Sequence, residues 1–132
     1  MGQQQLLLII LGVIVVGIAV AVGITMFTDN AVSANKDAVT NDLVNLASRA
    51  QQFYRRPLSL GGGQGTFTGG GGLTLAKLTS KPSNSNGTYA VTSVAAQQVV
   101  LDGTGTEKGV DGSPLSVTMT VFPDSTAVVF NN

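Results

Sequence analysis

The pattern of hydrophobic and polar positions changes twice along this chain and divides it into three parts. Residues 6–27 read LLLIILGVIVVGIAVAVGITMF, a run without a charged residue or a proline. Residues 28–56 mix apolar and polar positions at helical spacing, and residues 88–130 alternate them in short stretches. The first two parts predict helix, and the third predicts strands.

The apolar run is long enough to cross a bilayer. About 20 residues at roughly 1.5 Å rise each span a hydrocarbon core of about 30 Å. A secretory signal has an apolar core of only about 7 to 15 residues, so we interpret the run as a membrane span. Gly12, Gly17 and Gly23 interrupt it at spacings of five and six residues, which weakens the helix locally.

The residues after the run predict an amphipathic continuation of the same helix. One apolar stripe recurs at intervals of 7, 4, 3, 4 and 3 residues, at Val32, Val39, Leu43, Leu46, Ala50 and Phe53. The first proline is Pro57, and Arg55 and Arg56 precede it where cations favour a helix C-terminus. We therefore expect one helix from near Gln3 to Arg56, about 80 Å long.

Residues 57–87 predict a connecting segment. GGGQGTFTGGGG at 61–72 has Phe67 at its centre, and such glycine-rich chain is flexible unless a neighbour covers it. Residues 73–78 predict a short strand or turn, and SKPSNSNG at 80–87 predicts a loop.

The last third of the chain predicts three to four antiparallel strands, at 88–95, 98–102, 115–122 and 126–130. The clearest alternation puts one apolar face at Leu115, Val117, Met119 and Val121. This face needs a cover, and the available cover is the helical stripe at Val39, Leu43, Leu46, Ala50 and Phe53. The sequence thus predicts an α+β fold, in which a long N-terminal helix packs on a small C-terminal antiparallel sheet of three to four strands.

Composition excludes several classes of function. The 132 residues contain seven basic and seven acidic side chains, so zero net charge gives no electrostatic basis for binding nucleic acid. There is no cysteine and no histidine, which removes disulfides, thiolate or imidazole metal ligands and the commonest catalytic bases. Seven scattered aromatic residues form no stacking platform for bases. We expect no enzymatic activity and no cofactor.

Three local motifs favour plain structural interpretations. The glycine-rich loop lacks the lysine and Ser/Thr that follow a phosphate-binding loop. DGTGTEKGVD at 102–111 contains weak oxygen-ligand candidates for a metal, Asp102, Glu107 and Asp111, but its spacing is not that of an EF-hand, and we favour a strand connection. Asn86-Gly87-Thr88 fits a glycosylation sequon, and we favour a turn there.

A short polar leader ending in glycine, about 22 apolar residues, an amphipathic continuation of the helix and a small C-terminal sheet together resemble type IV pilins and the pseudopilins of type II secretion. The sequence-level likeness is confined to residues 1–56. The resemblance implies a subunit held in the inner membrane before assembly and then polymerised into an extracellular filament, with hydrophobic helices at the centre. It implies identical subunits, an assembly machinery and a leader peptidase as partners, and methylation of the new N-terminus.

By this resemblance Gly2 precedes the cut and Gln3 is the first mature residue. Leu7 then occupies the fifth mature position, where the family usually has a glutamate that neutralises a neighbour's amino terminus. If Met1 is the mature start instead, the fifth residue is Gln5, a neutral side chain that still accepts a hydrogen bond.

The family also commonly has a proline near the end of the apolar run, which loosens the helix. This chain has none there, and Gly17 and Gly23 provide the weakness instead. The expected assembly helix comprises Gln5, Leu6, Leu7, Gly12, Val16, Gly17, Gly23 and Phe27. Two other interpretations stay open: a single-span membrane-anchored surface protein with a small binding head, and a pseudopilin that moves secreted proteins through a pore.

Overall fold

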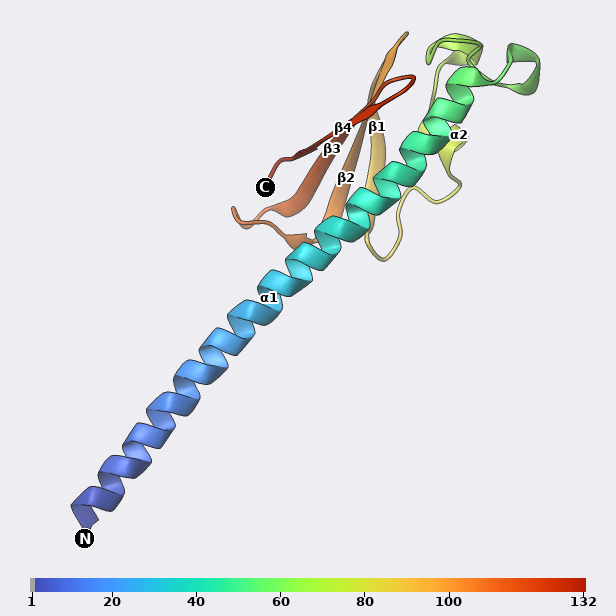
Figure 1. Cartoon of the computed structure of the whole chain (residues 1–132). Helices are drawn as coiled ribbons and strands as arrows, with labels where there is room; N and C mark the ends of the chain where they lie inside the picture. Colours follow the sequence, from blue (N-terminus) through green and yellow to red (C-terminus); the bar gives the residue numbers. More distant parts are fainter. Residues whose placement is uncertain (1) are drawn as a thin grey trace.

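A long helix carrying a small sheet near its far end is the architecture of this protein (Figure 1). The computed structural model describes residues 2–132. The helix is α1 (Gly2–Arg55), and the sheet contains β1 (Gly87–Ala95), β2 (Gln98–Lys108), β3 (Pro114–Val121) and β4 (Thr126–Phe130). The α+β fold expected from the sequence, with its long N-terminal helix on an antiparallel sheet, is confirmed.

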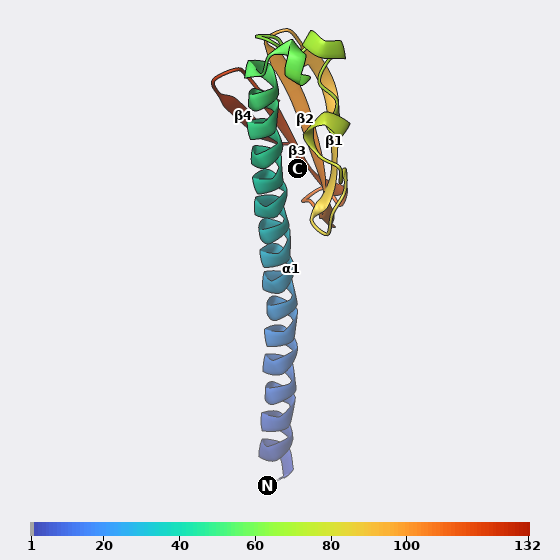
Figure 2. The same ribbon diagram turned by 90° about the vertical axis from the view of Figure 1, so that its right-hand side faces the viewer.

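The 54 residues of α1 form one uninterrupted helix, about 80 Å long at 1.5 Å per residue. Its first half projects away from the rest of the molecule, and its second half lies along the sheet (Figure 2). The helix ends just before Pro57, as expected for a residue without an amide proton. No proline interrupts residues 2–55, so the projecting half and the packed half are one rigid element.

The glycine-rich segment after α1 caps the helix. The amides of Gly63 and Gly65 donate to the carbonyls of Phe53 and Tyr54, at 2.8 and 2.7 Å. These are carbonyls that a helix end leaves without an intrahelical partner, so the segment satisfies them. A Cβ on Gly63 would lie 1.9 Å from the carbonyl oxygen of Thr66, which is why glycine is required at this close approach.

The connecting segment contains three short helices where the sequence indicated loop, strand or turn. They are the 3₁₀ helices η1 (Leu58–Leu60) and η2 (Gly69–Gly71) and the α-helix α2 (Leu75–Leu78). A short strand or turn was predicted at 73–78, and the strand is wrong. The amide of Thr79 donates to the carbonyl of Leu75, which closes a helical turn, and Leu78 is buried in the core. Such a single turn has too few residues to show a period.

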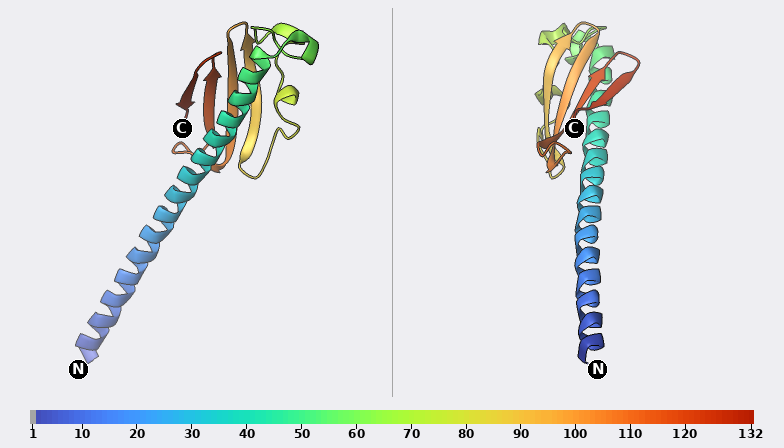
Figure 3. Two further views of the ribbon diagram at one scale, coloured as in Figure 1. Left: turned by 45° about the vertical axis from the view of Figure 1, so that its right-hand side comes forward. Right: turned by 90° about the vertical axis from the view of Figure 1, so that its left-hand side faces the viewer.

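The four strands form an antiparallel meander in the order β1-β2-β3-β4, with one face against α1 (Figure 3). In β3 the residues at 115, 117, 119 and 121 are buried and those between them are half-buried, which is the alternation of a sheet covered on one face. Every residue of β4 is exposed, so this edge strand extends beyond the cover that α1 gives.

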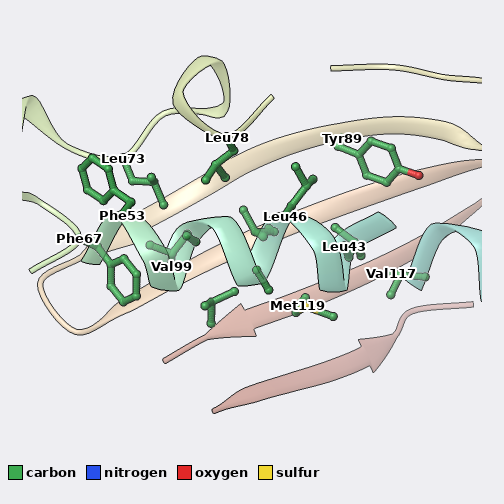
Figure 4. Packing of buried hydrophobic residues seen from close by; sticks show 14 of the residues in the cluster. Leu43, Leu46, Phe53, Phe67, Leu73, Leu78, Tyr89, Val99, Val117 and Met119 are labelled. Carbon is green, nitrogen blue, oxygen red and sulfur yellow. The ribbon is translucent and has the colours of Figure 1, made fainter. Parts of the chain in front are cut away.

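The main core lies between the second half of α1, the sheet and the connecting segment (Figure 4). All of the residues expected to pack helix on sheet are buried. They share this core with residues that the periodicity did not single out, namely Ala47, Phe67, Leu73, Leu78, Tyr89, Val99 and Leu101. Phe67 is fully buried, and its ring centroid lies 4.9 Å from that of Tyr54. The core therefore pins the glycine-rich segment through its one aromatic residue.

Strand β2 is longer than the 98–102 stretch predicted, because it continues to Lys108. The sequence indicated a connection there because glycines at 103 and 105 weaken a strand. Both glycines face α1: a Cβ on Gly103 would lie 2.7 Å from Cγ1 of Val39, and one on Gly105 would lie 2.2 Å from Oδ1 of Asn35. At these two positions side chains of α1 lie directly against the backbone of β2.

Candidate assembly surface and distal head

The first half of α1 is an apolar surface that its own chain leaves uncovered. The exposed fractions of Leu6 and Phe27, at the two ends of the run, are 60% and 76%. The residues expected to form the assembly helix are all exposed within α1: Gln5, Leu6, Leu7, Gly12, Val16, Gly17, Gly23 and Phe27. Burying the large side chains of this run is worth on the order of tens of kcal/mol, so water is not their stable surroundings.

By length and composition α1 is able to span a membrane. Two threonine hydroxyls, one inside the apolar run and one just after it, bond within the helix. The hydroxyl of Thr25 donates to the carbonyl of Ala21 at 3.1 Å, and that of Thr28 donates to the carbonyl of Ile24 at 3.0 Å. Such internal bonds are what lipid surroundings require, because a bilayer core supplies no partner to a polar group.

The glycines of the run have open space around them in the single chain. A Cβ added at Gly12, Gly17 or Gly23 would meet nothing within 4 Å. Gly12 and Gly23 are eleven residues apart, about three turns, so they lie on nearly the same side of α1. Packing within the chain does not explain these three small residues, whereas small residues of this kind allow another helix to approach closely.

The expected processing residues lie at the free end of α1. Gly2 is its first residue, and Gln3 follows within the helix; both are exposed. Gln3 also lines a shallow apolar hollow with Leu6, Leu7 and Ile10. Both residues of the expected leader junction are therefore accessible at this end of the helix.

A polar cluster ties the packed half of α1 to the loop before β1. The carboxylate oxygen Oδ2 of Asp42 accepts hydrogen bonds from Asn84 Nδ2 at 2.9 Å, Asn86 Nδ2 at 3.0 Å and the Tyr89 hydroxyl at 2.5 Å. Tyr89 is nearly buried, so its hydroxyl depends on this one acceptor. Sequence reasoning assigned Asp42 only to the polar face of the helix, because its partners lie more than forty residues away.

The cluster changes the acidity of two of its members. Burial by itself would raise the pKa of Asp42, but the hydrogen bonds from Asn86, Tyr89 and Asn84 outweigh it and hold the pKa below the ordinary value. Burial, and then the neighbouring Asp42 carboxylate, hold the pKa of Tyr89 well above its ordinary value. Asp42 is therefore ionised and Tyr89 is a neutral donor throughout the neutral pH range.

The geometry at Asn86 is unfavourable for glycosylation. The amide nitrogen that would carry the glycan donates to Asp42, and the side chain is half-buried. The carbonyl of the same residue accepts from Asn35 Nδ2 at 2.8 Å. In the folded subunit Asn86 belongs to the contact between loop and helix, which agrees with a structural role for the Asn-Gly pair.

The three carboxylates considered as metal ligands do not meet. Asp102 and Glu107 lie within β2, where five residues of extended chain separate them by about 17 Å. Asp102 accepts from the Thr118 hydroxyl at 2.8 Å, and Asp111 accepts from the amide of Ser113 at 2.9 Å. Across residues 2–132 no group of three or more potential metal ligands is found. The metal hypothesis was the weaker one from sequence, and the strand geometry contradicts it.

The distal end of the head, where α1 ends, has two open hollows. The larger, about 720 Å³, lies between the helix end and the start of the connecting segment and includes Tyr54, Pro57 and Gln64 in its lining. The second, about 340 Å³, is lined by Arg49, Gln52, Phe53, Arg56, Gly61 and Lys77. Sequence reasoning noted Arg56 only for its effect on the helix terminus and did not foresee this gathering of cations.

Comparison of the chain with family models, with curated proteins and with solved structures found no match.

Proposed function

We propose that this chain is a structural subunit that polymerises into a type IV pilus-like extracellular filament through residues 6–27 of α1. One observation carries the proposal. A single rigid helix is wholly uncovered over its apolar half and serves as the spine of a folded head over its other half. The uncovered half needs lipid or other copies of itself, and in this proposal it uses them in that order.

The stretch between Phe27 and the first buried helix residue, Val39, favours a filament over a simple anchor. It is helical throughout. Contact with the head begins at Asn35, whose side chain bonds to Asn86, so at 1.5 Å per residue about 12 Å of helix separates the apolar run from the head. A membrane anchor requires only a flexible linker at this point. A rigid spacer is useful where neighbouring helices pack side by side and heads must be held at a fixed radius.

Packing, and not transfer from lipid, must favour assembly in this proposal. Lipid tails are as apolar as leucine, so moving residues 6–27 from bilayer to filament core gains little hydrophobic free energy. In this proposal the free energy that favours the filament comes from close contact between helices. Open positions such as Gly12 and Gly17 allow that contact. Before assembly the subunit is held in the inner membrane, and afterwards it is part of a filament at the cell surface.

Substitutions in the run test this mechanism. We expect Gly12→Leu and Gly17→Leu to lower filament yield about tenfold or more while membrane insertion is unchanged, because the added side chains prevent close helix packing. Val16→Asp should abolish filaments, since a carboxylate inside a dry helix bundle lacks a partner. Filament yield is measured in the sheared fraction by electron microscopy, and insertion is measured by carbonate extraction of membranes.

Leu60→Asp is the matched control, because Leu60 is an exposed apolar residue of the head and not of the run. It should leave both measurements near those of the unaltered chain. Filaments in normal yield from Gly12→Leu, Gly17→Leu and Val16→Asp would contradict assembly through this segment.

A single-span surface protein with a binding head is the second candidate, and the 720 Å³ distal hollow is the observation in its favour. The two proposals differ in what cells release. Filaments in shed material support the subunit, whereas a monomer that is extracted only by detergent supports the anchored binding protein.

A further inference from the structure

Positive charge gathers in the 340 Å³ hollow at the distal end of the head. Arg49, Arg56 and Lys77 line it, and no carboxylate belongs to the lining as residues 2–132 form it. The ammonium of Lys77 bonds to the carbonyls of Gly70 and Gly72, at 2.9 and 2.6 Å, which fixes its charge at this site. The hollow is therefore a preformed cationic surface without a negative partner in its own lining.

Negative charge occurs nearer the membrane-facing end of the head, on residues 28–38 of α1. Asp29 and Asp37 are exposed there, ahead of the first buried residue, Val39. The one cation in this stretch, Lys36, lies over the ring of Phe130, 5.1 Å from its centroid. The two aspartates are thus left to face the surroundings of the subunit.

The two sets of charges are spaced almost equally along the chain, and Arg56 directly follows the last residue of α1, Arg55. Asp29 and Arg49 are 20 residues apart, and Asp37 and Arg56 are 19 residues apart. At 1.5 Å per residue both separations are about 30 Å. One shift of a second, parallel copy along the helix axis therefore brings both aspartates level with both arginines.

We propose that the cationic hollow receives residues 28–38 of α1 from a second copy of this chain, displaced by about 30 Å toward the distal end, with Asp37 of that copy beside Arg56 and Asp29 beside Arg49. The contact rests on the proposed filament and adds to it a register. Because the donor and acceptor surfaces differ, the contact is head-to-tail, and such contacts continue without closing into open helical arrays.

The charges set register and polarity more than they hold the filament together. An exposed ion pair contributes little in isolation and weakens as salt screens it. Like charges brought together, however, disfavour a wrong arrangement strongly. The contact thus fixes the axial displacement and the relative direction of the two copies that it joins.

Disulfide cross-linking of the assembled full chain tests the register, because the unaltered chain contains no cysteine. In a variant with Asp37→Cys and Arg56→Cys, the two positions are about 28 Å apart within one chain, so no disulfide forms inside a subunit. Oxidised filaments should give a ladder of covalent oligomers on a denaturing gel. The control, Asp37→Cys with Asn45→Cys, uses an exposed residue on the same side of α1 as Arg56 but about 16 Å nearer the membrane, and should give none.

A ladder from the control pair, or filaments without a ladder from the first pair, would overturn the register and leave the proposed function standing. Absence of filaments from the unaltered chain would instead overturn the proposed function, and this contact with it. The two failures are therefore distinguishable in one experiment.

Charge exchange gives a second test. Asp37→Lys and Arg56→Glu should each lower filament yield about tenfold, since each places like charges together at the contact. The double variant reverses both charges and should return the yield to within about threefold of the unaltered chain. Equal loss in single and double variants would overturn the pairing, because a loss of folding is not repaired by the second substitution.

Discussion

At the residue scale, Asp42 is the side chain on which the attachment of the head to the helix depends most clearly. It accepts three hydrogen bonds from the loop and from β1, and one of them comes from the hydroxyl of the buried Tyr89. Removing an acceptor leaves its donors without a partner. A buried donor without a partner costs more free energy than a typical hydrogen bond contributes.

Asp42→Ala should therefore destabilise the folded head by about 2 to 3 kcal/mol. The measurement is the free energy of unfolding from denaturant titration of the full chain in detergent. Asp37→Ala, an exposed aspartate one turn earlier, is the control and should change that free energy by about 0.5 kcal/mol or less. Equal effects of the two substitutions would show that the cluster contributes no stability.

The same residue gives a prediction for pH. The folded pKa of Asp42 lies below its ordinary value of 3.8, so its contribution is fully present above that value and is lost as pH falls through the folded pKa. The unfolding free energy of the unaltered chain should fall between about pH 5 and pH 2 more steeply than that of Asp42→Asn. Identical slopes would contradict the assignment of this carboxylate as the ionised acceptor.

Residue-scale detail was the part least accessible from sequence. The stripe at Val39, Leu43 and Phe53 was found because a buried helix face repeats with the helical period. Asp42 and Phe67 follow no such period, since their roles depend on partners brought near by the fold. Phe67 had one signal, an aromatic residue alone among glycines, but its burial became visible only with the capped helix end.

At the scale of elements, the closeness of α1 to β2 is set by two glycines that looked like a break in the strand. Gly103 and Gly105 occupy alternate positions on the face toward the helix, where side chains would collide with Val39 and Asn35. The sequence alone could not reveal this role of the two glycines. A glycine that ends a strand and a glycine that lets a helix pack closely on a strand are the same residue in a sequence.

Gly103→Ala should destabilise the head by about 1 to 3 kcal/mol, because the new methyl group overpacks the contact with Val39 and the ring of Tyr89. Thermal or denaturant unfolding of the full chain measures it. Thr104→Ala, the next residue on the exposed face, should cost about 0.5 kcal/mol or less. If Gly103→Ala is as stable as the unaltered chain, the helix and the sheet are not held at this distance.

The elements themselves were largely predictable, and the reason is physical. The limits of α1 follow from an apolar run, a stripe and a proline, each of which acts locally on the backbone. Strand β3 was found from its alternation and β4 from the turn before it. The short helices between 57 and 87 were not, because they form against the end of α1 and not from any preference of their own glycine-rich sequence.

At the scale of the whole molecule, the folded chain leaves one large apolar surface uncovered. The head has a buried hydrophobic core, whereas the apolar half of α1 contacts no other part of the described chain. The overall α+β arrangement was predictable because the apolar stripe of the helix and the apolar face of the sheet must both be buried. Packing one on the other buries both. How several copies pack depends on which surfaces the folded chain exposes. The sequence alone indicated only one such surface, the apolar run.

The most direct test of the central claim is an electron cryomicroscopy reconstruction of the material that cells expressing the full chain release by shearing. The proposal predicts a helical filament with a central bundle of parallel helices, one per subunit, in which density for residues 6–27 is enclosed and the β-sheet heads lie outside. Preparations that contain only single heads, with residues 6–27 left in membrane or detergent, would contradict it.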